Sequence, residues 1–289
     1  MRIAFLTCAS LARGHPDDRR VLPRAEALGL RIEFVDWATD RAWTDFDAVV
    51  IRTPWDYQHD LPRFLSVLRT IEASGVPLWN PSAVVEWNAD KGYLEELDRR
   101  GVRIVPTVFA ELESEDHLRA LIAEVGGDGV VKPRVGASGE DTWRLSADSV
   151  AWGEAVSALI GRDLLVQPFM SRILTEGETS LTVIDGEASH VFGKIPVPGE
   201  FRSQEEHGGR LEARVDPEFE AWALDLARSL PETRDLLYAR VDGIRDDDGR
   251  WCLGELELIE PKLYFTCAPD GTADRLADAI ASRLGAHQG

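Results

Sequence analysis

Two apolar segments near the end of the chain carry one arginine and three carboxylates, and no other feature limits the possible folds as strongly. Arg240 and Asp242 interrupt the first segment, and Glu255 and Glu257 interrupt the second. An acidic turn over 246–249 separates the segments, so we expect an antiparallel hairpin. Side chains two residues apart project from the same face of a strand. Glu255 and Glu257 are therefore predicted to converge with Asp242 on one face of the hairpin.

Carboxylates gathered on an apolar hairpin cannot all ionise cheaply unless a cation neutralises them. Hard oxygen ligands suit Mg²⁺ bridging nucleotide phosphates, and a neighbouring arginine provides the positive charge that phosphoryl transfer requires. On this interpretation Asp242→Asn should abolish turnover and leave the thermal transition nearly unchanged, because removing one crowded carboxylate relieves repulsion. The alternative is a half-exposed hairpin whose acidic face lies in water.

The N-terminal part of the chain alternates short apolar strands with helical patterns. Strands are predicted at 3–6, 31–35 and 48–51, and helices at 17–28 and 61–71. Strands separated by helices of this length indicate a parallel α/β layer. We assign residues 1–84 to a Rossmann-like α/β domain.

The remainder of the chain is predicted to form α+β lobes. Helices are expected at 89–100, 114–125, 149–160, 217–230 and 273–284. Strands are expected at 104–109, 129–134, 142–145, 164–169, 180–184, 188–195, 237–244 and 251–259. Asp185 and Gly186 separate two of these strands, and this dipeptide is a strong hairpin signal.

A lysine at a strand end precedes a loop of small residues. Lys132 is followed by a loop that includes Gly136, Ser138 and Gly139. Such a segment can offer a cation to a phosphate and backbone N–H groups that approach its oxygens closely. The alternative is a tight hairpin turn with no ligand. The chain contains neither a Walker loop nor a dinucleotide fingerprint.

Another strand ends in residues that could hold a nucleoside. Gln167, Pro168, Phe169 and Met170 close an apolar run, and proline there leaves backbone groups free to read an adenine edge. Acidic residues follow at 176 and 178 and could accept hydrogen bonds from ribose hydroxyls. The alternative is an edge strand that ends at proline. Lys91, in a helix expected to be capped by Asn88, would in isolation be a solvated lysine.

Taken in order, these segments resemble the ATP-grasp superfamily over residues 85–265. The resemblance implies an ATP-grasp fold with a small lobe over 85–170 and a large lobe with the metal site over 171–289. It also implies that Arg240 and Lys194 act on the reacting groups, while Asp242, Glu255 and Glu257 hold two Mg²⁺ ions, with Mn²⁺ as the alternative. The ATP-binding residues that it implies are Lys91, Lys132, Gly136, Ser138, Gly139, Gln167, Pro168, Phe169, Met170, Glu176 and Glu178.

Within the superfamily, the chain is similar to the cycloserine biosynthesis group of O-ureido-serine cyclo-ligases, which are related to prokaryotic glutathione synthetases. The similar segments are 52–57, 78–81, 87–91, 201–209 and 255–261. The resemblance implies an ATP-dependent carboxylate–amine ligase that acts on an amino acid or a small derivative through an acyl phosphate. Lys262 departs from the pattern, because a small residue is expected there. The alternatives are a ligase joining two separate substrates, a phosphotransferase and a non-catalytic nucleotide-binding module.

The substrate is predicted to meet the loop after the strand at 48–51, because ligands of open α/β sheets bind beyond the carboxyl ends of the strands. Arg52 could pair with a carboxylate and Asp56 with an ammonium group. The remaining candidates are Thr53, Trp55, Tyr57, Arg202 and His207. The alternative is that Trp55 and Tyr57 fill the seam between domains, with Arg52 and Asp56 as a local ion pair.

The composition limits the kinds of molecule that the protein is expected to bind. The formal net charge of −19 argues against binding of nucleic acid or an anionic membrane, but it allows one nucleotide in a locally basic cleft. The three cysteines have no zinc-site spacing, and no apolar run approaches eighteen residues. We therefore expect a cytoplasmic enzyme whose partners are ATP and a small amino-acid-like substrate, and for which a homodimer is an open alternative.

Overall fold

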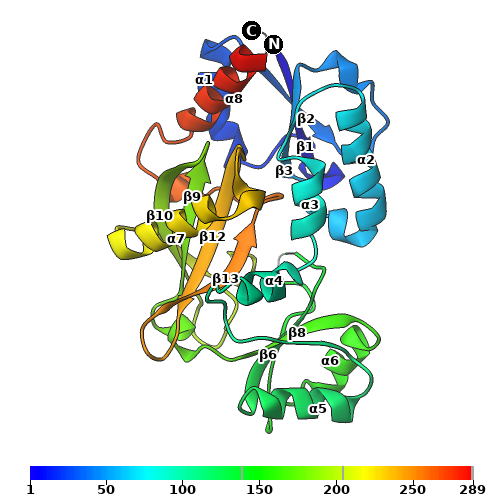
Figure 1. Cartoon of the computed structure of the whole chain (residues 1–289), viewed down its shortest axis with the longest axis vertical. Helices are drawn as coiled ribbons and strands as arrows, with labels where there is room; N and C mark the ends of the chain where they lie inside the picture. The colour runs from blue at the N-terminus through cyan, green and yellow to red at the C-terminus, as the bar shows by residue number, and fades with distance from the viewer. Residues whose placement is uncertain (138, 204, 288–289) are drawn as a thin grey trace.

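The strands form three sheets that follow one another along the long axis of the molecule. The computed structural model describes residues 1–137, 139–203 and 205–287. Figure 1 shows the N-terminal sheet at one end, a five-stranded sheet in the middle and a four-stranded sheet at the other end. Within these described ranges, no helix is both long and apolar enough to cross a membrane.

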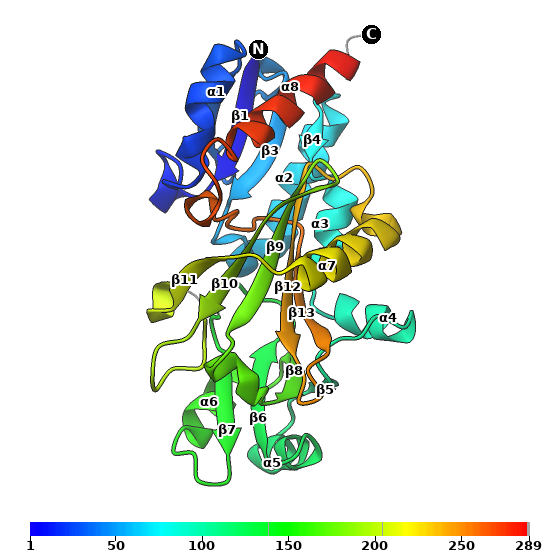
Figure 2. The ribbon, with the colours of Figure 1, turned by 90° about the vertical axis from the view of Figure 1, so that its left-hand side faces the viewer.

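The N-terminal sheet is parallel throughout, which confirms the predicted α/β layer. Its order is β2-β1-β3-β4, with bounds Arg31–Asp36, Arg2–Thr7, Ala48–Thr53 and Leu78–Trp79. Its helices are α1 (Leu22–Ala27), α2 (Leu61–Ala73) and α3 (Ser82–Asn88). The C-terminal helix α8 (Asp274–His287) returns to lie beside α1, and it shares a core cluster with strand β1 (Figures 1 and 2). A domain defined as residues 1–84 therefore leaves out α8, which packs with this layer.

The four-stranded sheet is antiparallel and has two helices packed against it. Its order is β5-β8-β6-β7, with bounds Val108–Glu111, Asp163–Pro168, Asp128–Pro133 and Trp143–Ser146. The helices α5 (Glu115–Glu124) and α6 (Trp152–Leu159) share one core cluster with it. The strand predicted to begin at 104 begins only at Val108, because Ile104 forms a bridge with Leu253 of the middle sheet.

The middle sheet is antiparallel and contains the predicted hairpins. Its order is β11-β10-β9-β12-β13, with bounds Arg210–Arg214, Glu187–Ile195, Glu178–Ile184, Tyr238–Arg245 and Trp251–Glu257. Asp185 and Gly186 both have positive φ angles, of 52° and 75°, as a tight hairpin turn requires. Helix α7 (Pro217–Ser229) packs against this sheet. Strand β11 was not predicted.

Asn88 corrects one predicted helix boundary. It is the last residue of α3 rather than the cap of the next helix, and α4 begins only at Tyr93 (Tyr93–Arg99). Its buried amide donates to the carbonyl of Leu256 at 2.8 Å and accepts from the N–H of Leu258 at 3.0 Å. These bonds satisfy backbone groups along the open edge of the sheet at β13. Lys91 consequently lies in the turn between α3 and α4.

A buried histidine in the middle sheet predicts acid sensitivity. Burial lowers the pKa of His190 to about 4, and its Nε2 donates to the carbonyl of Leu263 at 2.9 Å. Below pH 6.5 the histidine is protonated in the unfolded chain but stays neutral in the folded protein, so protonation favours unfolding. The contribution of His190 to stability is therefore present above pH 6.5 and is lost as the pH falls toward 4. Between pH 7 and pH 5 we expect urea unfolding to report a loss of about 2 kcal/mol from this group. His190→Gln should lose correspondingly less, and equal losses would contradict the assignment.

Candidate active site

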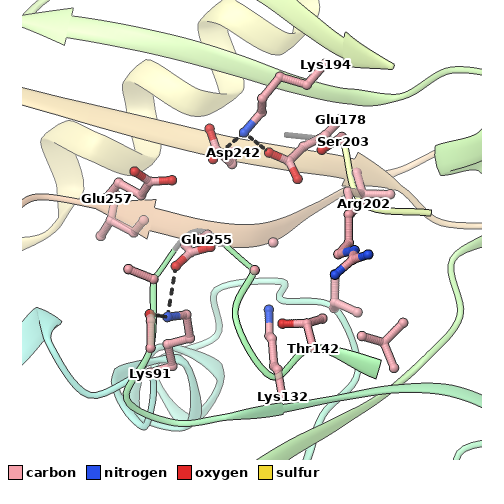
Figure 3. A pocket seen from close by; sticks show the side chains of 18 of the residues that line it. Lys91, Lys132, Thr142, Glu178, Lys194, Arg202, Ser203, Asp242, Glu255 and Glu257 are labelled. Atoms are coloured by element: carbon pink, nitrogen blue, oxygen red, sulfur yellow. Dashed lines mark hydrogen bonds and ion pairs between the residues drawn. The ribbon is translucent and has the colours of Figure 1, made fainter. Parts of the chain in front are cut away.

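A cavity of about 230 Å³ lies where the three sheets meet. The N-terminal layer contributes Trp55 and Tyr57, the small sheet contributes Lys132, and the middle sheet contributes Asp242 and Glu255. Figure 3 shows charged side chains from several elements pointing into it. All three sheets therefore contribute to the wall of this cavity.

The hairpin β12–β13 brings the carboxylates together on neighbouring strands, as the sequence predicts. Asp242 pairs with Glu255, and Arg240 pairs with Glu257. All four side chains line the cavity. The register shifts directly after Asp242, so a bulge follows the four charged residues. Bulges commonly re-aim side chains beside functional sites.

Asp242 lies between two buried cations. Its carboxylate accepts from Lys194 Nζ at 2.8 Å and from Arg240 Nε at 2.9 Å, and at most 5% of each of these three residues is exposed. Burial opposes ionisation of Asp242, but Arg240 and Lys194 outweigh it and hold its pKa well below its usual range. The carboxylate is therefore the counter-charge for both cations.

The other two carboxylates of the hairpin also have basic partners. Glu255 lies 3.3 Å from Lys91 Nζ, and Glu257 pairs with Arg240. Burial raises the pKa of Glu257 to about 8, whereas Lys91 and Lys132 overcome burial at Glu255 and lower its pKa. Asp242 repels the neighbouring carboxylates, but it also pairs directly with Lys194 and Arg240. Its removal would therefore leave two buried cations undercompensated, which argues against the expectation that it would only relieve repulsion.

The carboxylates are chemically suited to bind a metal ion, although they are not already arranged as a metal site. Among the described residues, no group of three or more His, Cys, Asp or Glu side chains is arranged to hold a metal ion. Asp242, Glu255 and Glu257 nevertheless line one cavity, and oxygen donors are the ligands that Mg²⁺ prefers. Lys91 and Arg240 supply the positive charge at Glu255 and Glu257 in this structure.

Lys91, Lys132 and Lys194 bring further positive charge to the cavity. Lys91 Nζ donates to the carbonyl of Gly136 at 2.6 Å, which connects the turn before α4 with the small-residue loop. Lys132 lies on β6, where burial lowers its pKa. Lys194 bridges Asp242 and Glu178 (Figure 3). Burial raises the pKa of Glu178 to about 7, although Lys194 acts against this shift.

The segment at the end of β8 forms another part of the wall. Gln167, Pro168, Phe169 and Met170 all line the cavity, and the Gln167 amide donates to Thr107 Oγ1 at 2.9 Å. Gly136 and Gly139 line it as well, whereas Ser138 lies outside the described residues. Glu176 is not a lining residue and pairs instead with Arg172 at 2.9 Å.

The structure corrects the substrate prediction for Arg52 and its neighbours. Strand β3 extends to Thr53, so Arg52 lies within the strand rather than in the loop beyond it. The Arg52 side chain is fully buried and pairs with Asp18 at 2.9 Å, which leaves it unable to meet a substrate. Thr53 Oγ1 donates to Thr7, and Asp56 accepts from the Trp37 indole at 2.6 Å.

The remaining substrate candidates divide into two groups. Trp55, Tyr57 and Arg202 line the cavity, and Arg202 also pairs with Glu200 at 2.8 Å. His207 is not among the lining residues. Sequence reasoning missed other side chains that reach the cavity from the segments after β10 and β13. They are Phe201, Ser203, Glu260, Lys262 and Tyr264.

Comparisons with known proteins identify relatives of this chain in both sequence and fold. A model of the N-terminal domain of D-cycloserine synthetase DcsG matches residues 3–80. The chain is 31% identical to the cycloserine biosynthesis protein DcsG of Streptomyces lavendulae, over 93% of this chain and 95% of that protein. A crystal structure of D-cycloserine synthetase DcsG superposes with a TM-score of 0.82 at 28% identity, covering 98% of this chain and 100% of that one. D-alanine–D-alanine ligase from Bacillus anthracis, complexed with ATP, shares the fold with a TM-score of 0.69 at 18% identity, with both chains covered completely.

Proposed function

The chain belongs to the family of the cycloserine biosynthesis protein DcsG, and we propose that its cavity activates the carboxyl group of an amino acid with ATP and joins it to a nitrogen. It is an ATP-dependent ligase with the ATP-grasp fold, and it forms C–N bonds. The observation that carries the proposal is that one cavity is lined by Arg240, by Lys91, Lys132 and Lys194, by the end of β8, and by the aromatic pair Trp55 and Tyr57.

In the proposed first step, an oxygen of the substrate carboxylate attacks the γ-phosphorus of ATP. The bond from that phosphorus to the bridging oxygen breaks, so ADP leaves and an acyl phosphate forms. Lys91, Lys132 and Lys194 would hold the phosphates, and Arg240 would stabilise the transferring group. Such fixed positive charge is the main contribution of a protein to phosphoryl transfer.

In the proposed second step, a nitrogen attacks the acyl carbon, the bond from carbon to the phosphate oxygen breaks, and the nitrogen loses a proton. Arg240 would then stabilise the tetrahedral oxyanion. The loop that contains Gly136 and Gly139 would shield the acyl phosphate from water. Two sources of the nitrogen are open: the same substrate, which gives a ring as in an O-ureido-serine cyclo-ligase, or a second substrate.

Mg²⁺ would supply positive charge against the ATP phosphates when it is bound, and we propose Asp242, Glu255 and Glu257 as its ligands. Two ions are proposed, with Mn²⁺ as a substitute. Gln167 to Met170 would hold the adenine and Glu178 the ribose. We place the reaction in the cytoplasm, with ATP and the amino acid as its partners.

A trapping assay tests the proposal. D and L forms of alanine, serine and O-ureido-serine are each incubated with ATP and Mg²⁺, with and without hydroxylamine. Hydroxylamine intercepts an acyl phosphate, so we expect amino-acid-dependent ADP release accompanied by a hydroxamate. Reactions without amino acid provide the control. A stable phosphorylated product without hydroxamate would instead identify a phosphotransferase.

A further inference from the structure

Among the residues that the structure describes, one carboxylate of the cavity forms no ion pair with a lysine, arginine or histidine. Six acidic side chains line the cavity, and five of them lie within 4 Å of a lysine, arginine or histidine nitrogen. The five are Glu140, Glu178, Asp242, Glu255 and Glu257. Within the described part of the chain, the sixth, Glu260, has no such contact. A carboxylate that is partly removed from water and has no cation in direct contact is suited to a cationic ligand.

The N-terminal layer and strand β12 together hold the backbone around Glu260 in place. The Trp55 indole donates to the carbonyl of Glu260 at 3.1 Å, and Arg52 Nη2 donates to the carbonyl of Pro261 at 2.9 Å. The Tyr238 hydroxyl donates to the carbonyl of Ile259 at 2.8 Å. Three consecutive carbonyls are therefore fixed, so the side chain is presented from a rigid support. Buried Arg52 thus acts on this segment rather than on a ligand.

Aromatic side chains complete the surroundings. Trp55 and Tyr57 line the cavity beside Glu260, and aromatic rings attract cations. Burial raises the pKa of Glu260 to about 7, while Lys91 and the Tyr57 hydroxyl favour its ionised form. A cationic ligand would complete this neutralisation.

We propose that Glu260, together with Trp55 and Tyr57, binds the protonated amino group of the substrate and makes the enzyme select amino acids over the same acids without the amine. An α-amino group lies one carbon from the carboxyl group. Holding the amine at Glu260 would therefore keep the carboxyl group in the same cavity, which Lys91 also lines. The inference rests on the proposed function, because it identifies the substrate class of the same cavity.

Paired substrates test this subsite. Each amino acid of the trapping panel is compared with the matching acid that lacks the amine: propanoate, 3-hydroxypropanoate or 3-(carbamoylaminooxy)propanoate. The measured quantity is the ratio of kcat/KM with the amine to kcat/KM without it. Glu260→Gln should lower this ratio by about tenfold or more, as expected for loss of a charged hydrogen bond. The KM for ATP should stay within about twofold of wild type, since Glu260 contacts the other substrate.

Asp56→Asn provides the matched control. It removes one negative charge from the same region, but Asp56 accepts from Trp37 and does not line the cavity. Its ratio should equal that of wild type, and Glu260→Asp should recover part of the selectivity. If turnover of a variant is too slow, calorimetry in the presence of ADP gives the corresponding ratio of binding constants for each pair, and Glu260→Gln should lower that ratio as well.

An unchanged ratio in Glu260→Gln would overturn the subsite and leave the proposed function intact. An equal loss of selectivity in Asp56→Asn would also overturn it. If wild type neither binds nor turns over any amino acid of the panel, the proposed function fails, and the subsite fails with it.

Discussion

Arg240→Gln should lower the turnover of ATP by on the order of 10³-fold while nucleotide binding remains measurable. The guanidinium lines the cavity, and it is fixed by Asp242 on its own strand and by Glu257 on the next. Because the guanidinium is already in position, the protein does not have to reorganise when the phosphoryl group moves. Removing the guanidinium should therefore slow the chemical step itself. Single-turnover kinetics with saturating ATP measure that step directly.

Arg245→Gln is the matched control for this prediction. Arg245 lies on the same strand, but its side chain donates to the carbonyl of Gly249 and to Glu218 outside the cavity. This variant should keep the wild-type rate. Equal rates for wild type and Arg240→Gln would contradict the role assigned to Arg240.

Asp242→Asn should destabilise the fold by about 3 kcal/mol, because it removes one partner of a buried ionic network. Lys194 and Arg240 both direct donors at this carboxylate, and asparagine would leave their positive charges undercompensated. Unfolding in urea without nucleotide gives the free energy directly.

Asp128→Asn is the control, since Asp128 pairs with Arg144 at 2.7 Å in a bridge that is 36% to 42% exposed. Exposed pairs contribute roughly 1 kcal/mol or less, so this variant should be nearly as stable as wild type. If Asp242→Asn were as stable as Asp128→Asn, the carboxylates would be crowded as the sequence alone suggested.

Local patterns predicted most of the elements but few of the contacts between them. The hairpin of Asp242 and Glu255 followed from alternation and a turn, which are properties of neighbouring residues. The role of Asn88 could not be read in the same way, because its partners Leu256 and Leu258 lie about 170 residues away in the sequence. The packing of α8 against the N-terminal layer could not be predicted either, because α8 lies at the other end of the sequence from the strands it covers.

The cavity was likewise predicted in part. Most of the proposed ATP-binding residues line it, because strand ends and small-residue loops leave a local signal in the sequence. Arg52 was placed incorrectly, since its burial depends on Asp18 and on the carbonyl of Pro261 across the interface. Glu260 was missed because a carboxylate without a basic partner is recognised only when all its spatial neighbours are known.

The central claim is that the substrate carboxylate accepts the γ-phosphoryl group before the C–N bond forms. The most direct measurement uses an amino acid of the panel with ¹⁸O in both carboxyl oxygens. Attack on phosphorus and later cleavage of the acyl carbon–oxygen bond transfer one of these oxygens to phosphate. Mass spectrometry of the released phosphate should therefore find one ¹⁸O atom per molecule, and phosphate without the label would contradict the account.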